Sequence, residues 1–263
     1  MARNTFTGKR VLITGASSGI GAEFADLLAA QKVDLVLVAR RRELMEQLAA
    51  DLRRKYGVDV IVEAIDLASP GAAACLKNGL DERSLSIDIL INNAGYGLQG
   101  DFLDTPIERT VDMIQLNITA LTELSHIFGR DMAARGSGHI LLVASLLAFQ
   151  AVPTYAAYAA TKAYVLAFGE ALHDEVRSRG VVVTTLCPGH TATGFDAAAG
   201  ASVSPMLRLL TMDARPVAAS GLRALAKGKA SVVAGLSNKM AAFSNRWAPR
   251  SMQRATMKTI LGS

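Results

Sequence analysis

The sequence predicts a doubly wound α/β fold: a parallel sheet of about seven strands with helices on both faces. Short aliphatic runs such as VLIT, LVLVA and VVVTTL alternate with longer segments whose apolar residues recur at helical spacing. The short runs are apolar throughout rather than at every second position, which is typical of strands covered on both faces. A repeated β-α-β order with right-handed crossovers then produces a doubly wound sheet.

The elements follow one another without a linker, a low-complexity tract or an internal repeat, so we expect one domain, residues 1–263, that ends in a tail. Strands are expected at residues 10–14, 34–39, 58–64, 87–91, 138–144, 181–186 and 231–234. Helices are expected at residues 20–30, 42–56, 70–82, 107–135, 155–179 and 216–226.

The composition, 51% hydrophobic and 19% charged, is that of an ordinary globular protein. The cysteines Cys75 and Cys187 lie far apart without metal-site spacing, which favours a reducing compartment and no disulfide framework. The four histidines are scattered, so we expect no metal site. The N-terminal MARNTFTGKR lacks signal-peptide character, and we expect a cytoplasmic protein. Residues 140–161 are uncharged over the length of a membrane span, but Gln150 and Pro153 indicate a strand, a loop and a helix start instead.

Charge is distributed unevenly along the chain. The net charge is +5, yet residues 1–203 hold 18 basic and 22 acidic side chains, whereas residues 204–263 hold 10 basic side chains and one acid, Asp213. The basic segment is consistent with a solvated face, a subunit contact, or attraction to a membrane surface, an acidic carrier protein or a charged substrate tail. Nucleic acid is not the expected partner, because the basic residues are spread out and only Phe243 and Trp247 lie near them.

A glycine-rich turn, TGASSGIG from Thr14 to Gly21, follows the first strand and opens directly into a helix. Glycines let the backbone approach a pyrophosphate, and the helix N-terminus offers free N–H groups and the positive end of its dipole. A first β-α junction is the context that a Rossmann-type dinucleotide site requires. We therefore predict that the chain binds a dinucleotide.

The end of the second strand indicates which dinucleotide. NAD sites usually place an acid there for the ribose 2′-hydroxyl, but this chain reads Arg40-Arg41-Arg42 with no acid before Glu43. Arg40 and Arg41 suit a 2′-phosphate, and positive charge at a helix start opposes the helix dipole, so an anion is favoured there. The expected cofactor is NADP(H).

Ser145, Tyr158 and Lys162 form a second motif. A tyrosine and a lysine four residues apart lie on the same face of a helix. A free tyrosine has a pKa of about 10, and a neighbouring ammonium would lower that pKa toward the range in which a phenol acts as acid or base. Ser145, at a strand end, would hold a carbonyl or alcohol oxygen. The three residues predict carbonyl or alcohol chemistry without a metal.

Together with Asn92-Asn93-Ala94-Gly95 and the Pro188-Gly189 motif, these features resemble the short-chain dehydrogenase/reductase family, in its compact single-domain branch. The stretches LVARR, NNAGYG, YAATKAY and LCPGHTATGF are similar to those of bacterial general short-chain dehydrogenases and of ketosteroid and 3-ketoacyl reductases. The resemblance covers about residues 8–195. It implies a Rossmann-type fold, a small-molecule substrate and a homodimer or homotetramer.

The resemblance also implies a role for each matched residue. Tyr158 would donate the proton in reduction and accept it in oxidation, while Lys162 would hold the nicotinamide ribose and lower the pKa of Tyr158. Ser145 would hydrogen-bond the substrate oxygen, and Asn117 would anchor a water in a proton relay. The implied cofactor contacts are Gly15, Ser17, Ser18, Gly19, Ile20 and Gly21 at the pyrophosphate, Arg40 and Arg41 at the 2′-phosphate, Asp66 and Leu67 at the adenine, Asn93, Ala94 and Gly95 beside the adenine ribose, and Tyr158, Lys162, Pro188, Gly189, Thr191 and Thr193 toward the nicotinamide.

The segments outside these motifs predict the substrate side. By the same resemblance residues 195–212 form a substrate lid, and their Met and Leu content favours an apolar ceiling. His190 is a candidate substrate contact. The basic C-terminal tail, residues 236–263, would cover the pocket, pack in an oligomer or lie on a membrane surface. The predicted apolar wall consists of Leu147, Phe149, Val152 and Tyr155.

The expected function is NADP(H)-dependent hydride transfer to or from the carbonyl or secondary alcohol of a hydrophobic substrate, with ketone reduction the favoured direction. Two alternatives stay open. One is a non-catalytic module that senses NADP(H), which the loss of a catalytic residue would indicate. The other is a reductase that docks to a membrane or an acidic carrier protein through its basic tail.

Overall fold

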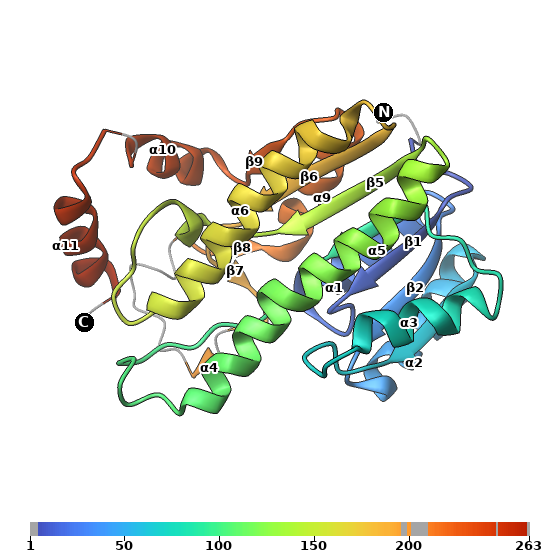
Figure 1. Ribbon diagram of the computed structural model, residues 1–263, viewed down its shortest axis with the longest axis horizontal. Coiled ribbons are helices and arrows are strands. Elements are labelled where there is room, and N and C mark those ends of the chain that lie inside the picture. Colours follow the sequence, from blue (N-terminus) through green and yellow to red (C-terminus); the bar gives the residue numbers. More distant parts are fainter. Residues whose placement is uncertain (1–4, 196–198, 201–209, 246, 262–263) are drawn as a thin grey trace.

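Seven strands form one parallel sheet in the order β3-β2-β1-β4-β5-β6-β9 (Figure 1). The computed structural model describes residues 5–195, 199–200, 210–245 and 247–261. The predicted fold class is confirmed; β1 and β2 have the predicted bounds, and the other strands differ by one or two residues at an end. The strands are β1 (Arg10–Thr14), β2 (Asp34–Ala39), β3 (Val60–Ala64), β4 (Ile89–Asn92), β5 (Gly138–Val143), β6 (Val181–Cys187) and β9 (Ser231–Val233).

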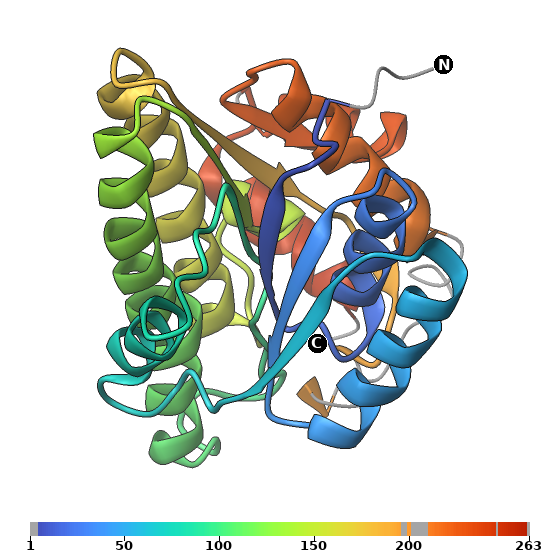
Figure 2. The same ribbon diagram turned by 90° about the vertical axis from the view of Figure 1, so that its right-hand side faces the viewer.

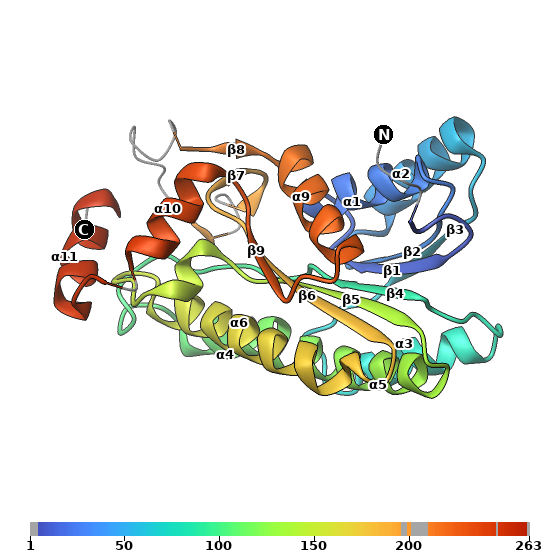
Figure 3. The same ribbon diagram turned by 90° about the horizontal axis from the view of Figure 1, so that it is seen from above.

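Helices cover both faces of the sheet, which lies between two layers of helices in Figure 2 and Figure 3. One layer consists of α1 (Gly19–Ala29), α2 (Arg42–Tyr56) and α9 (Ala214–Ala226). The other consists of α3 (Ala72–Asp81), α5 (Leu121–Ala134) and α6 (Ala156–Arg177). The helix expected at residues 107–135 is divided: α4 (Ile107–Ile114) continues into α5 through a π-helical segment, Gln115–Ala120.

Alternate side chains of the strands enter two separate cores. Leu35 and Leu37 of β2 belong to the core that includes residues of α1, α2 and α9. Val36 and Val38 belong to the core that includes residues of α3, α5 and α6. Because successive side chains of a strand point to opposite faces, both sets must be apolar. This explains why the strand sequences are apolar throughout.

The C-terminal tail forms two helices, α10 (Leu236–Ser244) and α11 (Arg250–Leu261), which lie at one end of the sheet (Figure 1). Pro249 stands between them, where the sequence pattern is broken. A short parallel pair, β7 (Thr191–Ala192) and β8 (Met212–Asp213), and a 3₁₀ turn, Leu146–Phe149, were not predicted. Within the described ranges, no helix is long and apolar enough to cross a membrane.

The strand order places the ligand site. β1 lies between β2 and β4, so the chain proceeds to one side of the sheet after β1 and to the other side after β4. The loops that leave these two neighbours diverge and open a crevice at the carboxyl ends of the strands, which is where open α/β sheets bind ligands. The glycine turn and the Asn92–Gly95 motif both begin at this crevice.

Candidate active site

A cavity of about 730 Å³ occupies the carboxyl ends of the strands. Nearly all of the predicted site residues line it, so the structure brings together motifs that are up to 178 positions apart, from Gly15 to Thr193. Gly21 and Asn117 do not line the cavity and lie directly behind it. In the described part of the chain, no cluster of His, Cys, Asp and Glu could hold a metal ion. The predicted residues in the lining are Gly15, Ser17, Ser18, Gly19, Ile20, Arg40, Arg41, Asp66, Leu67, Asn93, Ala94, Gly95, Ser145, Tyr158, Lys162, Pro188, Gly189, Thr191 and Thr193.

The glycine turn fits a pyrophosphate. Gly15 and Gly19 have φ angles of +66° and +58°, which glycine adopts without strain. Gly21 is required for another reason: a Cβ there would lie 2.2 Å from the carbonyl oxygen of Gly15. The side chain of Ser18 does not cap the first turn of α1, so it leaves the first N–H groups of the helix available to an anion. The residues present therefore suit the dinucleotide that the motif predicts.

Thr14 and Asn93 hold the turn against the end of β4. The Thr14 hydroxyl accepts hydrogen bonds from the backbone N–H groups of Asn93 (3.0 Å) and Ala94 (2.9 Å). The Asn93 side-chain amide donates to the carbonyl oxygens of Thr14 (2.9 Å) and Gly15 (3.2 Å). Asn93 therefore acts as a structural clamp as well as a cavity wall. Thr14 was missed as a site residue, although its place at the strand end was a usable signal.

The two arginines after β2 take different positions. Arg41 donates from one guanidinium nitrogen to the hydroxyls of Ser17 and Ser18, each at 2.8 Å, and so spans the glycine turn. Arg40 is 70% exposed and lies 4.0 Å from a carboxylate oxygen of Asp66. Both guanidinium groups line the cavity beside the expected adenosine end. Two cations at this place can bind an anionic group.

Ser145 and Tyr158 meet at the opposite end of the cavity. Ser145 lies two residues beyond the end of β5 and accepts a hydrogen bond from the N–H of Leu147 at 3.1 Å, which fixes its hydroxyl at the start of the 3₁₀ turn. Tyr158 lies on the first turn of α6 and is 7% exposed. Burial raises the pKa of Tyr158, and a hydrogen bond with the Ser145 hydroxyl opposes that increase. The phenol is therefore protonated at neutral pH and able to donate a proton.

Lys162 does not lower the pKa of Tyr158 here, contrary to the sequence-based expectation. Its Nζ lies 5.9 Å from the centre of the Tyr158 ring and donates to the carbonyl oxygen of Val143 at 2.9 Å. Burial lowers the pKa of Lys162 itself to about 8. An ammonium directed at a carbonyl, away from the phenol, has little effect on the pKa of Tyr158, so desolvation of Tyr158 dominates.

Asn117 supports the catalytic end from behind. It is fully buried in the π-helical segment; its amide oxygen accepts from the N–H of Tyr96 (3.2 Å), and its amide nitrogen donates to the Tyr96 carbonyl (2.9 Å). The same nitrogen donates to the Thr161 hydroxyl (3.1 Å). A Cβ on Gly95 would lie 2.8 Å from the Asn117 oxygen and 3.3 Å from Lys162 Nζ, so these three residues are adjacent. π-Helical turns of this kind are frequent at functional sites.

The substrate end is a cluster of apolar side chains around Tyr158. Leu147 and Tyr155 line the cavity and confirm the wall prediction, and Val152 belongs to the same cluster without lining the cavity. Phe149 was wrongly placed, because it packs against the core that includes residues of α5 and α6. Sequence reasoning missed several members, because they come from a distant loop and from α4. The missed members are Tyr96, Leu98 and Met113, whereas Phe195 belongs to the predicted lid and Met257 to the tail that was expected to cover the pocket.

The boundaries of the predicted lid are visible, although residues 196–198 and 201–209 lie outside the described residues. Phe195 packs with its ring centre 5.4 Å from that of Tyr158, and Leu210 also lines the cavity. His190 lines the cavity as predicted, and its Nδ1 is 2.8 Å from the Thr211 hydroxyl. The β7–β8 pair holds the two ends of this segment together.

The tail forms one wall of the cavity. Met257 of α11 is 7% exposed and belongs to the apolar cluster, and Ser237, Asn238 and Ala241 of α10 also line the cavity. Asn238 packs against Gly189, where a Cβ would lie 2.3 Å from its amide nitrogen. Of the three placements considered for the tail, the structure shows that it covers the cavity.

Comparison with known proteins identifies the family. The family model for short chain dehydrogenases matches residues 9–203. The chain belongs to the short-chain dehydrogenase family. This confirms the resemblance drawn from the motifs and makes the protein an oxidoreductase of the short-chain dehydrogenase/reductase class.

Individual relatives share much of this fold. The very-long-chain 3-oxoacyl-CoA reductase of Homo sapiens is 33% identical over 190 residues, which cover 71% of this chain and 60% of that protein, so the chain spans about three fifths of that relative's length. A short-chain dehydrogenase from Sphingobium yanoikuyae in complex with NADPH is 33% identical with a TM-score of 0.82, covering 91% of this chain and 93% of that one. A 7β-hydroxysteroid dehydrogenase is 27% identical with a TM-score of 0.87, covering 98% and 99%.

Proposed function

We propose that the protein transfers hydride between NADP(H) and the carbonyl or secondary alcohol of a hydrophobic substrate, and that it works as a ketone reductase. One observation carries the proposal. A single cavity has two arginines at one end and the Ser145–Tyr158 pair, surrounded by apolar side chains, at the other. The glycine turn lies between these ends, as a bound dinucleotide requires.

The side chains supply the proton and its positioning. When bound, the nicotinamide cofactor provides the hydride. The Ser145 hydroxyl donates a hydrogen bond to the substrate oxygen, where negative charge develops. The raised pKa of Tyr158 keeps its proton in place until that oxygen becomes basic enough to accept it. The lowered pKa of Lys162 suits it to restore that proton through the buried polar groups around Asn117.

The arginines support NADP(H) rather than NAD(H). Arg40 is solvent-exposed, and its ion pair with Asp66 is long and exposed, so the pair is weak and Arg40 is free to turn toward a 2′-phosphate. Arg41 is held by two serine hydroxyls beside the same place. That a related dehydrogenase is known in complex with NADPH agrees with this assignment.

The apolar cluster supports a hydrophobic substrate. Around Tyr158 the cavity presents Leu147, Tyr155, Phe195 and Met257, which can exclude water from the reacting carbonyl but offer few partners to a polyhydroxylated substrate such as a sugar. The names of two relatives, a very-long-chain 3-oxoacyl-CoA reductase and a 7β-hydroxysteroid dehydrogenase, fit the same substrate class.

The decisive experiment measures NADPH oxidation with a panel of hydrophobic ketones. Tyr158→Phe removes the acid while keeping the ring, and we expect turnover to fall by roughly 100- to 10,000-fold. Tyr164→Phe is the matched control: Tyr164 lies on the same helix, bonds to Thr122 and stays outside the cavity, so its variant should match the wild type. A Tyr158→Phe enzyme of near wild-type turnover would refute the mechanism.

Cofactor choice is tested separately. Arg40→Asp should weaken NADPH binding by roughly tenfold to a hundredfold, because it replaces a charge-assisted hydrogen bond by repulsion, and should change NADH binding little. Arg42→Asp provides the control, since Arg42 pairs with Glu46 and lies outside the cavity lining. An equal effect of Arg40→Asp on both cofactors would reject the 2′-phosphate role.

A non-catalytic NADP(H) sensor is the second candidate. Such a module would be expected to lack at least one catalytic side chain. All four are present here and adjacent to one another: Asn117, Ser145, Tyr158 and Lys162. This arrangement favours turnover. A homodimer or homotetramer and a cytoplasmic location stay predictions, which sedimentation and fractionation would test.

A further inference from the structure

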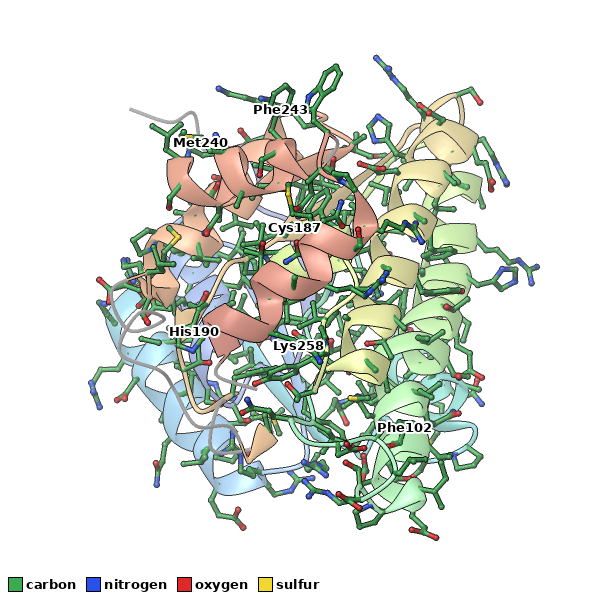
Figure 4. All side chains as sticks on the ribbon, turned by 90° about the vertical axis from the view of Figure 1, so that its left-hand side faces the viewer. Phe102, Cys187, His190, Met240, Phe243 and Lys258 are labelled. Carbon is green, nitrogen blue, oxygen red and sulfur yellow. The ribbon has the colours of Figure 1, made fainter. Side chains whose placement is uncertain are left out.

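The outer face of the tail is unusually apolar for an exposed surface. Leu236, Met240 and Phe243 follow one another at helical spacing on α10, and Trp247 stands just beyond its end. Their side chains are 75%, 66%, 60% and 79% exposed, and Met252 of α11 is 55% exposed. Figure 4 shows Met240 and Phe243 at the margin of the molecule above α10. We call these five residues the tail stripe. Exposed apolar side chains gathered in this way mark a contact surface.

The surroundings of the tail stripe are basic. Residues 236–263 contain five Lys or Arg and no acid. Four of these cations, Lys239, Arg250, Arg254 and Lys258, are exposed, and none forms an ion pair within the described residues. Other surface cations are paired; Arg215, for example, contacts Glu23 and Asp26. The charges on the tail therefore lack partners among the described residues and favour an external anion.

We propose that the tail stripe and its surrounding cations dock the protein onto the surface of an anionic phospholipid bilayer. Apolar side chains with an exposed Trp and Phe suit the interface between headgroups and acyl chains, where Trp is enriched. Each nearby Lys or Arg is attracted by the negative surface potential of such a membrane. Since no described helix could span the bilayer, the proposed contact is peripheral, with the tail lying on the membrane surface.

Other occupants fit less well. A second copy of the chain, joined through the same face by two-fold symmetry, would bring two sets of unpaired cations together. An acidic carrier protein would satisfy the cations but gives no reason for a row of exposed apolar side chains. An anionic bilayer satisfies both at once.

Docking in this orientation has a consequence for the cavity. The same two helices also line it, through Ser237 and Ala241 of α10 and Thr256 and Met257 of α11. A bilayer against the tail stripe would therefore lie beside the helices that line the cavity, so a lipid-soluble substrate would have a short path to it. Docking does not depend on the reductase function, and its test requires no turnover.

Trp247 is a built-in probe, because it is the single tryptophan of the sequence. We expect its emission to shift to shorter wavelength when the full-length protein meets vesicles of phosphatidylcholine and phosphatidylglycerol at about three to one, and to be quenched when the lipids carry brominated acyl chains. Vesicles of phosphatidylcholine alone should give a much weaker shift, and added salt should reverse the response to the anionic vesicles.

Paired variants distinguish binding through the tail stripe from non-specific binding of the protein to vesicles. Met240→Ser with Phe243→Ser should weaken vesicle binding at least tenfold, whereas Phe102→Ser, which removes a 51% exposed aromatic far from the tail in the lower right of Figure 4, should not. Lys239→Glu with Arg254→Glu should weaken binding by roughly fivefold or more per charge, whereas Lys227→Glu with Lys229→Glu, two exposed lysines outside the tail, should not.

Three results would overturn the proposal: an unchanged Trp247 emission with anionic vesicles, equal losses in the test and control variants, or a shift produced by protein concentration alone. The last would show that a second copy covers the stripe. A response to purified acyl carrier protein without a response to vesicles would assign the surface to an acidic partner and would also reject the bilayer.

Discussion

The two ends of the cavity are built in different ways. The nucleotide side, residues 14–21 and 92–95, consists of backbone held by hydrogen bonds at the ends of two adjacent strands, such as those from Asn93 to Thr14 and Gly15. The substrate side, the cluster around Tyr158, consists of side chains from separate loops and from the tail helix α11. We therefore expect changes on the nucleotide side to affect stability and cofactor binding together, and changes on the substrate side to affect mainly which substrate is used.

The largest effect is expected at Gly21. In Gly21→Ala the new Cβ would lie 2.2 Å from the carbonyl oxygen of Gly15, a backbone atom that cannot move without opening the turn. We expect a loss of at least about 3 kcal/mol of unfolding free energy, together with loss of dinucleotide binding measured by calorimetry. Gly79→Ala is the control, because Gly79 lies in α3 with no atom near its Cβ position, and it should stabilise the fold by about 0.5–1 kcal/mol. If Gly21→Ala and Gly79→Ala had equal effects on stability and dinucleotide binding, the close contact at Gly21 would not be what requires glycine there.

Asn117 connects the two sides of the cavity, and its replacement should have the next-largest effect on stability. Asn117→Ala leaves the N–H and carbonyl of Tyr96 without their partners in a buried place, which we expect to cost about 2–3 kcal/mol in urea unfolding. Asn117→Asp keeps the acceptor for the Tyr96 N–H and should recover part of the stability but little activity, because a carboxylate next to Lys162 changes its proton affinity. If both variants keep wild-type turnover, Asn117 is outside the proton path.

Replacing Lys162 should change the free energy of unfolding in the opposite direction, because removing this side chain stabilises the fold. Burial lowers its pKa to about 8 from 10.5, a depression worth roughly 3 kcal/mol, while its hydrogen bond to Val143 contributes about 1 kcal/mol. Lys162→Met should therefore gain about 2 kcal/mol at pH 7 and lose activity. The cost of holding the ammonium is complete below pH 8 and disappears as the pH rises toward 10.5.

The pH dependence distinguishes this explanation from better packing. Urea unfolding of both proteins from pH 7 to pH 10.5 should show the advantage of Lys162→Met shrinking steadily above pH 8. The raised pKa of Tyr158 lowers the stability of both proteins above pH 10, so it cancels in the difference. An advantage that is constant over this range would indicate that the methionine simply packs better.

The contrast between the two sides also explains what the sequence could predict. The glycine turn, the strands and the Tyr158–Lys162 spacing were predicted correctly, because each depends on residues within one or two elements. The π-helical segment, the hydrogen bonds of Thr14 and the direction of the Tyr158 pKa shift were not, because they depend on burial and on contacts between distant segments. Met257 lies 99 positions from Tyr158, and nothing in its local pattern indicates that they share a cluster.

The smallest effect on stability is expected at Met257. It is buried against the substrate side, but α11 packs at the edge of the molecule and can undock locally, so Met257→Ala should cost about 1 kcal/mol or less in global unfolding. The space vacated admits about two further methylene groups, each worth about 0.8 kcal/mol on burial, so KM for ketones longer by two carbons should fall by about tenfold while KM for NADPH stays unchanged. Met252→Ala, on the same helix but exposed, is the control and should leave the chain-length preference as it is. A change in KM for NADPH instead would mean that the tail acts on the nucleotide side, and the two ends of the cavity would then be coupled rather than separate.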